Sequence, residues 1–401
     1  MGDGTLGVFQ KLKILLINDY ARGLYGAEIQ MLILRDGLQR RGYDVRYFAS
    51  YAGCGRGRSL ADYECFGTTS RFQTLLQMAN PWAFWRLRRV LATFQPDIVH
   101  IRMFLNQLSP LILLLLRHRP SLYHIVTYEA ICPLGTKIFP DGNHCRVRAG
   151  MACYDNHCLP LRAMLPQMLR MILWRRWRNA FSLIVANSEA VRHHFFAEFA
   201  KPVEVVLNGI PTRPSRPPLS FPPTVAFAGR LVREKGVEVL VRAFANVVKE
   251  LPDARLLLAG EGPERNRLKK LIAALELSQG ISMLGYLPPA ELEYRFSTAW
   301  VQAVPSLWEE PFGNVATESM MRGTAVVASN SGGLTEIVRD RQTGILVPPG
   351  DEVALAEALV LLLRNRDLAE KMGRAGREVA LTHFSETTSV DKFTRLYEML
   401  S

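Results

Sequence analysis

The chain has 401 residues, of which 48% are hydrophobic, and carries a formal net charge of +12. This length predicts about two or three domains, with enough apolar residues to build their cores. No apolar run reaches the ~18 residues of a membrane-spanning helix, and residues 1–10 lack the basic segment and apolar core of a signal peptide. Six cysteines in so long a chain argue against a disulfide scaffold, so we expect a cytoplasmic protein.

The positive charge is concentrated in the first half of the chain. Residues 1–210 hold 26 Lys and Arg against 14 Asp and Glu, whereas residues 211–401 hold 23 of each. The acid-free segment 156–188 carries two tryptophans and the arginines Arg162, Arg170, Arg175, Arg176 and Arg178. Such a helix can lie on an anionic membrane at the inner face of the cell membrane; the alternative is a helix packed on a sheet with its arginines in solvent.

The first half alternates between predicted strands and helices. Residues 13–18 predict a buried strand, and Gly23 and Gly26 precede helical spacing over 29–38. This strand, glycine turn and helix start can hold a phosphate, although a purely structural turn explains the same residues. Further strands are predicted at 43–50, 97–101, 122–127, 182–187 and 203–207, helices at 82–94 and 161–177, and irregular structure at 51–79.

A stiff linker separates the two halves, because residues 211–223 contain six prolines. The second half opens with a predicted strand at 224–228, followed by G-R-L-V-R-E-K-G at 229–236. Arg230 and Lys235 therefore lie between a strand and a helix, where two cations can bind a diphosphate and balance the charge of a departing nucleotide. The alternative is a pair of solvated surface charges.

Residues 305–318 are the most informative stretch of the sequence. An apolar run at 300–304 predicts a strand, Pro305 and Pro311 require a loop, and helical spacing runs from Gly313 to Gly323. A helix start with a glycine favours phosphate binding, and the carboxylates of Glu310 and Glu318 suit sugar or ribose hydroxyls on either side.

These motifs resemble a known family. Glu310 and Glu318 are separated by seven residues with Pro-Phe-Gly between them. This spacing and the segment 229–236 are similar to the E-x7-E and G-R-L-x-x-x-K-G signatures of retaining glycosyltransferases of family 4. The resemblance implies an α/β chain with the GT-B fold, in which two Rossmann-like parallel-sheet domains face a cleft. The expected divisions are an acceptor-binding domain (1–210), the linker (211–223), a donor-binding domain (224–385) and a last helix (386–401) that packs back on the first domain.

The resemblance also implies roles for individual residues. Glu310 is expected to orient the donor sugar, and Glu318 to hold the donor ribose. Relatives carry a sugar-contacting His at the position of Val126; His124 lies two residues earlier on the same strand face and is expected to substitute in part. The expected catalytic residues are Glu310, Arg230, Lys235 and His124. The expected donor-binding residues are Gly23, Gly26, Gly260, Tyr286, Phe312, Gly313, Asn314, Val315 and Glu318, and the expected acceptor-side residues are His100, Tyr128 and Glu129.

No cofactor is expected. No two aspartates are separated by one residue, so the sequence lacks a DxD metal site. Cys132, Cys145, Cys153 and Cys158 crowd one loop, and thiolates can hold a structural zinc ion. We favour ordinary loop cysteines, because this spacing fits no common zinc motif.

We therefore predict an enzyme that moves a sugar, with retention of configuration, from a UDP-, GDP- or ADP-linked donor to a glycan or lipid-linked acceptor, in bacterial envelope or exopolysaccharide synthesis. Two other classes fit parts of the sequence. One is a nucleotide-sugar epimerase or a pyridoxal-dependent phosphorylase on a similar fold. The other is a basic membrane- or nucleic-acid-binding protein. The balanced charge of the second half argues against the latter, and we expect no nucleic-acid partner.

Overall fold

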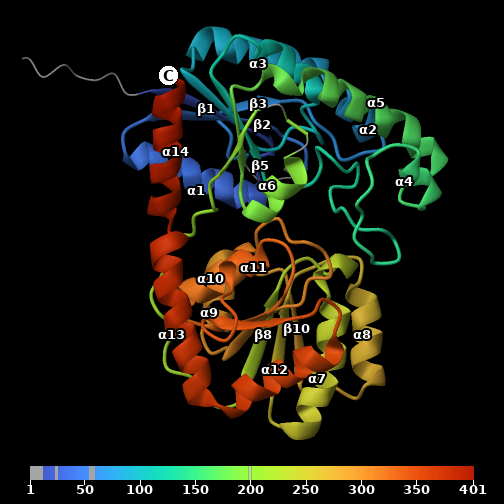
Figure 1. Ribbon diagram of the computed structural model, residues 1–401, viewed down its shortest axis with the longest axis vertical. Helices are drawn as coiled ribbons and strands as arrows, with labels where there is room; N and C mark the ends of the chain where they lie inside the picture. The colour runs from blue at the N-terminus through green and yellow to red at the C-terminus, as the bar shows by residue number, and fades with distance from the viewer. Residues whose placement is uncertain (1–11, 23–25, 54–58, 197, 200) are drawn as a thin grey trace, which may run out of the picture.

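The computed structural model describes residues 12–22, 26–53, 59–196, 198–199 and 201–401. They form two α/β domains, one above the other in Figure 1. The first sheet has the strand order β3-β2-β1-β4-β5-β6-β7, the second the order β10-β9-β8-β11-β12-β13. Neighbouring strands in both sheets pair in parallel, which requires a crossover between successive strands and explains the alternation seen in the sequence.

The first domain places helices on both faces of its sheet. Helices α3, α5 and α6 and the 3-10 helix η1 share one apolar core with the sheet, and α1 and α14 share the other. Its strands are β1 (Lys13–Tyr20), β2 (Asp44–Ser50), β3 (Tyr63–Cys65), β4 (Ile98–Ile101), β5 (Ser121–Ile125), β6 (Leu183–Ala186) and β7 (Val203–Val205). Its helices are α1 (Gly26–Arg40), α2 (Gln73–Met78), α3 (Pro81–Phe94), η1 (Pro110–Leu115), α4 (Ala152–Asp155), α5 (Leu161–Trp177), η2 (Arg178–Ala180) and α6 (Glu189–Phe195).

The second domain repeats this plan around a sheet whose central strands β8, β11 and β12 are buried and whose edge strand β10 is mostly accessible. Its strands are β8 (Thr224–Ala228), β9 (Arg255–Ala259), β10 (Ile281–Gly285), β11 (Val301–Val304), β12 (Ala325–Ser329) and β13 (Gly344–Val347). Its helices are η3 (Arg233–Lys235), α7 (Val237–Glu250), α8 (Arg265–Ala274), α9 (Pro289–Phe296), α10 (Asn314–Arg322), α11 (Leu334–Ile337), α12 (Glu352–Arg364) and α13 (Arg366–His383). Among the described residues, no helix combines the length and apolar character needed to cross a bilayer.

The last helix, α14 (Glu386–Leu400), returns to the first domain and packs along α1. In Figure 1, α13 and α14 run up one side of the molecule from the second domain to the first. The contact is close, because a Cβ at Gly37 would lie 2.7 Å from Val390 Cγ2. Arg41 and Asp391 add an ion pair of 2.6 Å. The two domains are therefore joined twice, by the linker and by α13–α14.

The segment predicted to be irregular contains two short elements. Within 51–79, β3 pairs with the end of β2 in a register that sets Tyr63 against Phe48, and α2 buries Leu76. Elements of three and six residues are too short to show a periodic apolar pattern, which is why the sequence did not predict them.

Candidate functional site

The strand, loop and helix predicted around Gly313 lie at the edge of the second domain that faces the first. β11 ends at Val304, and α10 begins at Asn314. Gly313 has a φ of 117°, and a Cβ at this position would lie 2.6 Å from Leu334 Cδ2, so only glycine fits without strain. No side chain caps α10, and its first N–H groups therefore keep the capacity to hydrogen-bond a phosphate.

Lys235 and Glu310 come together at this edge although they lie 75 residues apart. Lys235 Nζ donates to Glu310 Oε1 at 2.5 Å, and Ser306 Oγ donates to the same oxygen at 2.6 Å. Burial alone would raise the pKa of Glu310, but the lysine and the hydroxyl outweigh it and hold this pKa below the usual value. Glu310 is thus an oriented carboxylate anion at neutral pH.

Backbone contacts hold the loops that carry these residues. A Cβ at Gly236 would lie only 1.8 Å from Pro305 O, so the loop after β8 touches the loop after β11. A Cβ at Gly260 would lie 1.8 Å from Gly229 O. The Gly260 N–H donates to Gly285 O at 2.7 Å, which places the exposed Tyr286 at the end of the neighbouring strand.

Three other residues expected at the donor differ in accessibility. Arg230 is half-exposed and lies 3.4 Å from Glu234, an arrangement that leaves its charge available. Glu318 is partly exposed; burial raises its pKa, while Arg213 and Arg322 oppose the shift. Phe312 is buried with its ring 6.0 Å from that of Phe384, so it supports the loop from below and does not line a ligand surface.

A chain of hydrogen bonds links the two domains at the starts of α1 and α10. Asn208 Nδ2 donates to Asn314 Oδ1 at 2.9 Å, and Arg102 Nη2 donates to Asn208 Oδ1 at 2.8 Å. Arg102 Nη1 lies 3.3 Å from the carbonyl oxygen of Ala27. A Cβ at Gly26 would lie 3.0 Å from Asn314 Nδ2, so the two helix starts converge. Gly23, the other glycine of the predicted turn, lies outside the described residues.

Sequence reasoning missed Arg102 and Asn208. The guanidinium of Arg102 is buried, which lowers its pKa to about 9, a value that still leaves it charged at neutral pH. Its position carried a signal, because it directly follows the buried strand β4, and ligands of α/β sheets gather at the carboxyl ends of strands. Asn208 carried the same kind of signal, because it directly follows the strand predicted at 203–207.

Two carboxyl groups lie at the same edge of the first domain. Asp19, at the end of β1, is fully buried and accepts three backbone N–H bonds, from Asn106, Gln107 and Leu108. Burial and the nearby Glu129 raise its pKa to about 7 despite those bonds. Glu129 is partly exposed and accepts a hydrogen bond of 2.7 Å from Asn106 Nδ2. Burial also raises the pKa of Glu129.

The structure places the two predicted histidines and Tyr128 away from any ligand surface. His124 and His100 are buried beneath α14, with the His124 ring 5.0 Å from Phe393 and His100 Nδ1 2.6 Å from Tyr397 Oη. Burial holds the pKa of both well below the usual value, so both rings are neutral. Tyr128 is fully buried against His194 and Trp308. These side chains can support the cleft, but they are not exposed on its surface.

The cysteine loop contains four free thiols in the part of the chain that the structure describes. Cys153 is buried, and Cys132, Cys145 and Cys158 are partly exposed. Among the described residues, no group of three or more His, Cys, Asp or Glu side chains is arranged to hold a metal ion. The loop does reach the other domain, since Arg233 Nη2 donates to Asp141 O at 3.0 Å.

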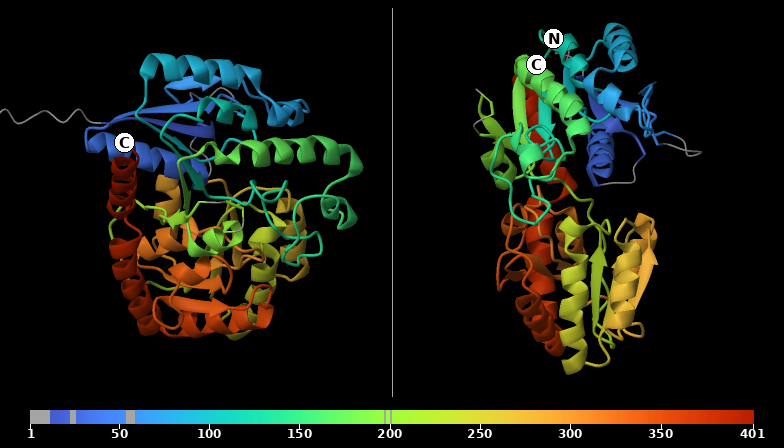
Figure 2. Two further views of the ribbon diagram at one scale, coloured as in Figure 1. Left: turned by 45° about the horizontal axis from the view of Figure 1, so that its top comes forward. Right: turned by 90° about the vertical axis from the view of Figure 1, so that its right-hand side faces the viewer.

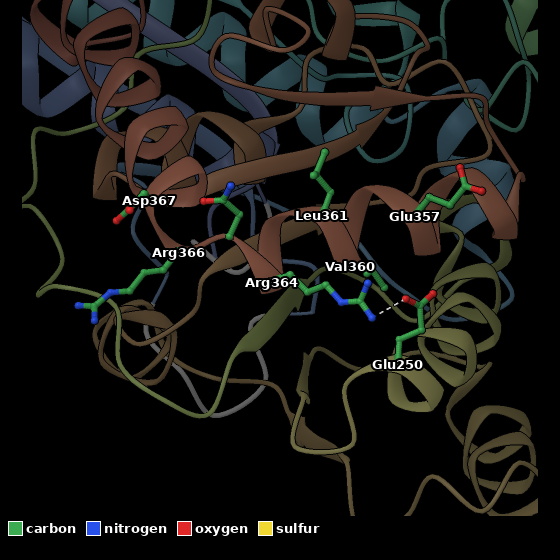
Figure 3. Close-up of a pocket in the computed structure, with 8 residues that line it drawn as sticks. Glu250, Glu357, Val360, Leu361, Arg364, Arg366 and Asp367 are labelled. Carbon is green, nitrogen blue, oxygen red and sulfur yellow. Dashed lines mark ion pairs between the residues drawn. The ribbon is translucent and has the colours of Figure 1, made fainter.

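A hollow of about 690 Å³ lies on the second domain, between the ends of α7 and α12 and the start of α13. Figure 3 shows its charged lining, including the ion pair between Arg364 and Glu250, which are 2.8 Å apart. These helix ends lie at the opposite edge of the sheet from Gly313 and Lys235, and the hollow is therefore not part of the site between the domains.

Two parallel-sheet domains that face each other across such a site define the GT-B class of fold. Two family models match the chain, one described as glycosyltransferase family 4 over residues 25–213 and the other as glycosyl transferases group 1 over residues 213–379. The chain is 31% identical over 263 residues to a phosphatidyl-myo-inositol mannosyltransferase of Mycobacterium leprae, a match that covers 64% of this chain and 69% of that protein. The chain therefore belongs to the group 1 glycosyltransferases of family 4.

Other matches are shorter or more distant. The chain spans about half the length of other curated relatives, 45% and 53% in two cases. Sucrose-phosphate synthase from Thermosynechococcus elongatus superimposes with a TM-score of 0.76 at 22% identity, over 97% of this chain and 99% of that one. HepE from Anabaena, solved with UDP-glucose, superimposes with a TM-score of 0.68 at 19% identity, over 97% of this chain and 100% of that one. These two likenesses show the fold alone.

Proposed function

We propose that the protein transfers a sugar from a nucleotide-sugar donor to a glycan or glycolipid acceptor with retention of configuration. The observation that supports this most strongly is the pairing of Lys235 with the buried Glu310 beside the glycine-fixed start of α10. A cation, an oriented carboxylate and a free helix start are what a sugar diphosphate requires. The HepE structure that holds UDP-glucose makes UDP-sugars the first donors to test.

Each side chain has a chemical task in this proposal. Arg230 and Lys235 stabilise the charge that develops on the departing diphosphate, and the backbone of Gly313–Val315 binds a phosphate. Glu310 orients the donor sugar, and Glu318 accepts hydrogen bonds from the ribose. Tyr286 and Gly260 border the nucleotide, and Gly26 lets the start of α1 approach Asn314 at the proposed donor site. Four of the predicted residues pack inside the protein and do not touch the substrates in this proposal: His124, His100, Tyr128 and Phe312.

The transfer needs no nucleophilic side chain in this proposal. The acceptor hydroxyl attacks the anomeric carbon from the face that the diphosphate leaves, the bond from that carbon to the phosphate oxygen breaks, and the departing phosphate oxygen takes the hydroxyl proton. Arg230 and Lys235 stabilise the negative charge that develops on the diphosphate during this step. Glu129 lies on the acceptor side and can accept a hydrogen bond from a second acceptor hydroxyl.

A thermal-shift screen against UDP-, GDP- and ADP-sugars tests the donor. A donor present at about one hundred times its dissociation constant stabilises the folded state by about 2.7 kcal/mol. Lys235→Gln should lose the shift, whereas Arg364→Gln, in the hollow of Figure 3, should keep it. If none of the sugars stabilises the protein while a nucleic acid does, the proposal fails.

We also propose that the transfer is independent of divalent metal, in the cytoplasm of a bacterium that builds envelope or exopolysaccharide. The arginine and lysine supply the positive charge that a metal ion supplies elsewhere. Turnover should survive EDTA unchanged. Complete loss with rescue by Mn²⁺ or Mg²⁺ would contradict this, and rescue by Zn²⁺ alone would point to the cysteine loop.

A further inference from the structure

Helix α5 presents a row of apolar side chains to solvent. Leu161, Leu165, Leu169 and Ile172 are 66%, 79%, 41% and 59% exposed. Their spacing of four, four and three residues places them on one face of the helix. A helix that covers a sheet normally keeps its apolar residues on the inner face. Here a second row of apolar side chains faces solvent, so its burial does not contribute to the stability of the fold.

The inner face of α5 is fully occupied, so the helix cannot turn to bury this row. Met164, Met171 and Trp174 are buried in the core of the first domain. Arg170 is also buried, and its guanidinium donates to Leu105 O at 3.3 Å and to Pro133 O at 3.0 Å. This corrects the prediction that Arg170 belongs to a basic outer surface. Its charge holds the loops after β4 and β5, at the edge of the domain that faces the cleft.

Helix α2 extends the apolar surface. Phe72, directly before α2, and Leu75 within it are 56% and 57% exposed. The two helices lie side by side in Figures 1 and 2, and Gln167 Nε2 of α5 donates to Gln77 Oε1 of α2 at 3.0 Å. We call this surface the α2–α5 face; its apolar residues are Phe72, Leu75, Leu161, Leu165, Leu169 and Ile172.

The α2–α5 face is bordered by positive charge and built from segments without acidic residues. Arg71, Arg162 and Arg176 are exposed, and the Arg71 guanidinium lies 5.3 Å from the centre of the Phe72 ring. Residues 65–96 and 156–188, which form α2, α3 and α5, contain no Asp or Glu. Of the other arginines in the second segment, Arg178 pairs with Glu198 at 2.6 Å. Exposed leucine and phenylalanine bordered by arginine match an anionic lipid surface in both hydrophobicity and charge.

We propose that the α2–α5 face docks the protein on an anionic lipid bilayer, with the leucines and Phe72 among the lipid chains and the arginines at the phosphates. One helix diameter, about 10 Å, separates this face from the loops that Arg170 holds at the cleft. A lipid-linked acceptor would therefore enter from the bilayer beside Glu129. The docking itself does not depend on the proposed sugar transfer. The inference that a lipid-linked acceptor enters from the bilayer does rest on that proposed function.

Co-sedimentation with lipid vesicles tests the docking. The full chain should bind vesicles containing about 30% phosphatidylglycerol at low salt and should not bind vesicles of phosphatidylcholine alone. The double variant Leu165→Gln/Ile172→Gln should raise the lipid concentration for half-binding at least about tenfold. The triple variant Arg71→Gln/Arg162→Gln/Arg176→Gln should do the same. The control pair Val353→Gln/Leu361→Gln alters exposed apolar residues of α12 and should leave binding unchanged.

Three outcomes would overturn the inference. The first is an absence of vesicle binding, and the second is equal binding by the apolar variant and the wild type. The third is a dimer in solution that the apolar variant dissociates, which would assign the face to a second copy of the chain. Turnover of a water-soluble acceptor analogue is measured on the same samples. If the variants lose vesicle binding and keep turnover, only docking is affected; if the wild type binds vesicles without donor turnover, the proposed function fails and the docking stands.

Discussion

In the second domain the loops at the cleft meet backbone against backbone, beside the Lys235–Glu310 pair, whereas in the first domain buried polar side chains bind the loop backbone. Gly236 lies against Pro305, and Gly260 against Gly229, so that a single Cβ would clash. On the opposite side, Asp19 and Arg170 bind backbone groups of the loops after β4 and β5. The second domain, the proposed donor side, thus relies largely on steric fit, whereas the first domain, the proposed acceptor side, relies on buried polar groups that respond to their surroundings.

This difference indicates which of the two domains tolerates changes in the residues that hold its cleft loops. A backbone contact admits only glycine, so the donor loops keep one shape. A buried charge can be exchanged for another polar group that satisfies the same backbone atoms. We infer that the first domain sets the acceptor and that the second preserves the donor chemistry.

The strongest test of the steric side is Gly236→Ala. Its φ is 66°, and the new Cβ would lie 1.8 Å from Pro305 O, so we expect a loss of more than about 3 kcal/mol in the free energy of unfolding. Urea denaturation measures this. Gly150→Ala is the matched control, because no heavy atom lies within 4 Å of a Cβ there. Equal midpoints for Gly236→Ala and wild type would show that backbone contact does not hold these loops.

The next test measures how much the positive charges of the second domain contribute to turnover, separately from the steric fit of its loops. Arg230→Ala and Lys235→Ala should each raise the barrier expressed in kcat/KM by about 2–4 kcal/mol, because a preorganised cation is lost from the departing diphosphate. Lys235→Ala also leaves Glu310 unpaired and should lower stability, whereas the exposed Arg230 can be removed without that cost. Lys269→Ala, on the exposed side of α8, is the control. Normal turnover in both variants would remove them from the proposed reaction.

The acceptor side should respond to pH through Asp19. Its pKa is 3.8 in an ordinary environment and about 7 in the folded protein, so the native state holds the extra proton between these values and loses stability as the pH rises through them. The advantage of wild type over Asp19→Asn should therefore shrink between pH 5 and pH 8 by on the order of 2 kcal/mol.

Denaturant unfolding at both pH values measures this shift for Asp19→Asn. Asp253→Asn, at an exposed turn, is the control and should show no such trend. Because Glu129 raises the pKa of Asp19, Glu129→Gln should reduce the pH effect. A pH-independent difference between wild type and Asp19→Asn would mean that Asp19 does not titrate in this range.

The smallest effect concerns the contact between the two sides. Glu336 of the second domain accepts hydrogen bonds of 2.9 and 2.8 Å from the backbone N–H groups of Glu189 and Ala190, at the start of α6. Glu336→Gln should weaken the contact between the domains by about 0.5–1.5 kcal/mol. Small-angle X-ray scattering should then show a larger radius of gyration, while Glu357→Gln, on the outer side of α12, should not change it. Identical scattering from all three proteins would contradict this role.

The features of this protein that have a local cause could be predicted from its residues. The glycines of 229–236 and 313–323, the linker prolines and the alternation of strands with helices all act within about ten residues, so the α/β class, the division into two domains and the helix start at Asn314 could be predicted. The family followed from the same local motifs, since the spacing of Glu310 and Glu318 is read along a single loop and helix.

Contacts between side chains far apart in the sequence could not be predicted, because they depend on how the whole chain folds. Every residue of β5 is buried, so the pattern of its side chains did not indicate which helix would cover His124. In the fold, His124 lies under α14 beside Phe393, which is 269 residues further along the chain. The same holds for Arg170, which the sequence placed in solvent and the fold placed against two loop carbonyls. A buried parallel sheet is apolar on both faces, and the identity of the helix that covers each face depends on the path of the whole chain.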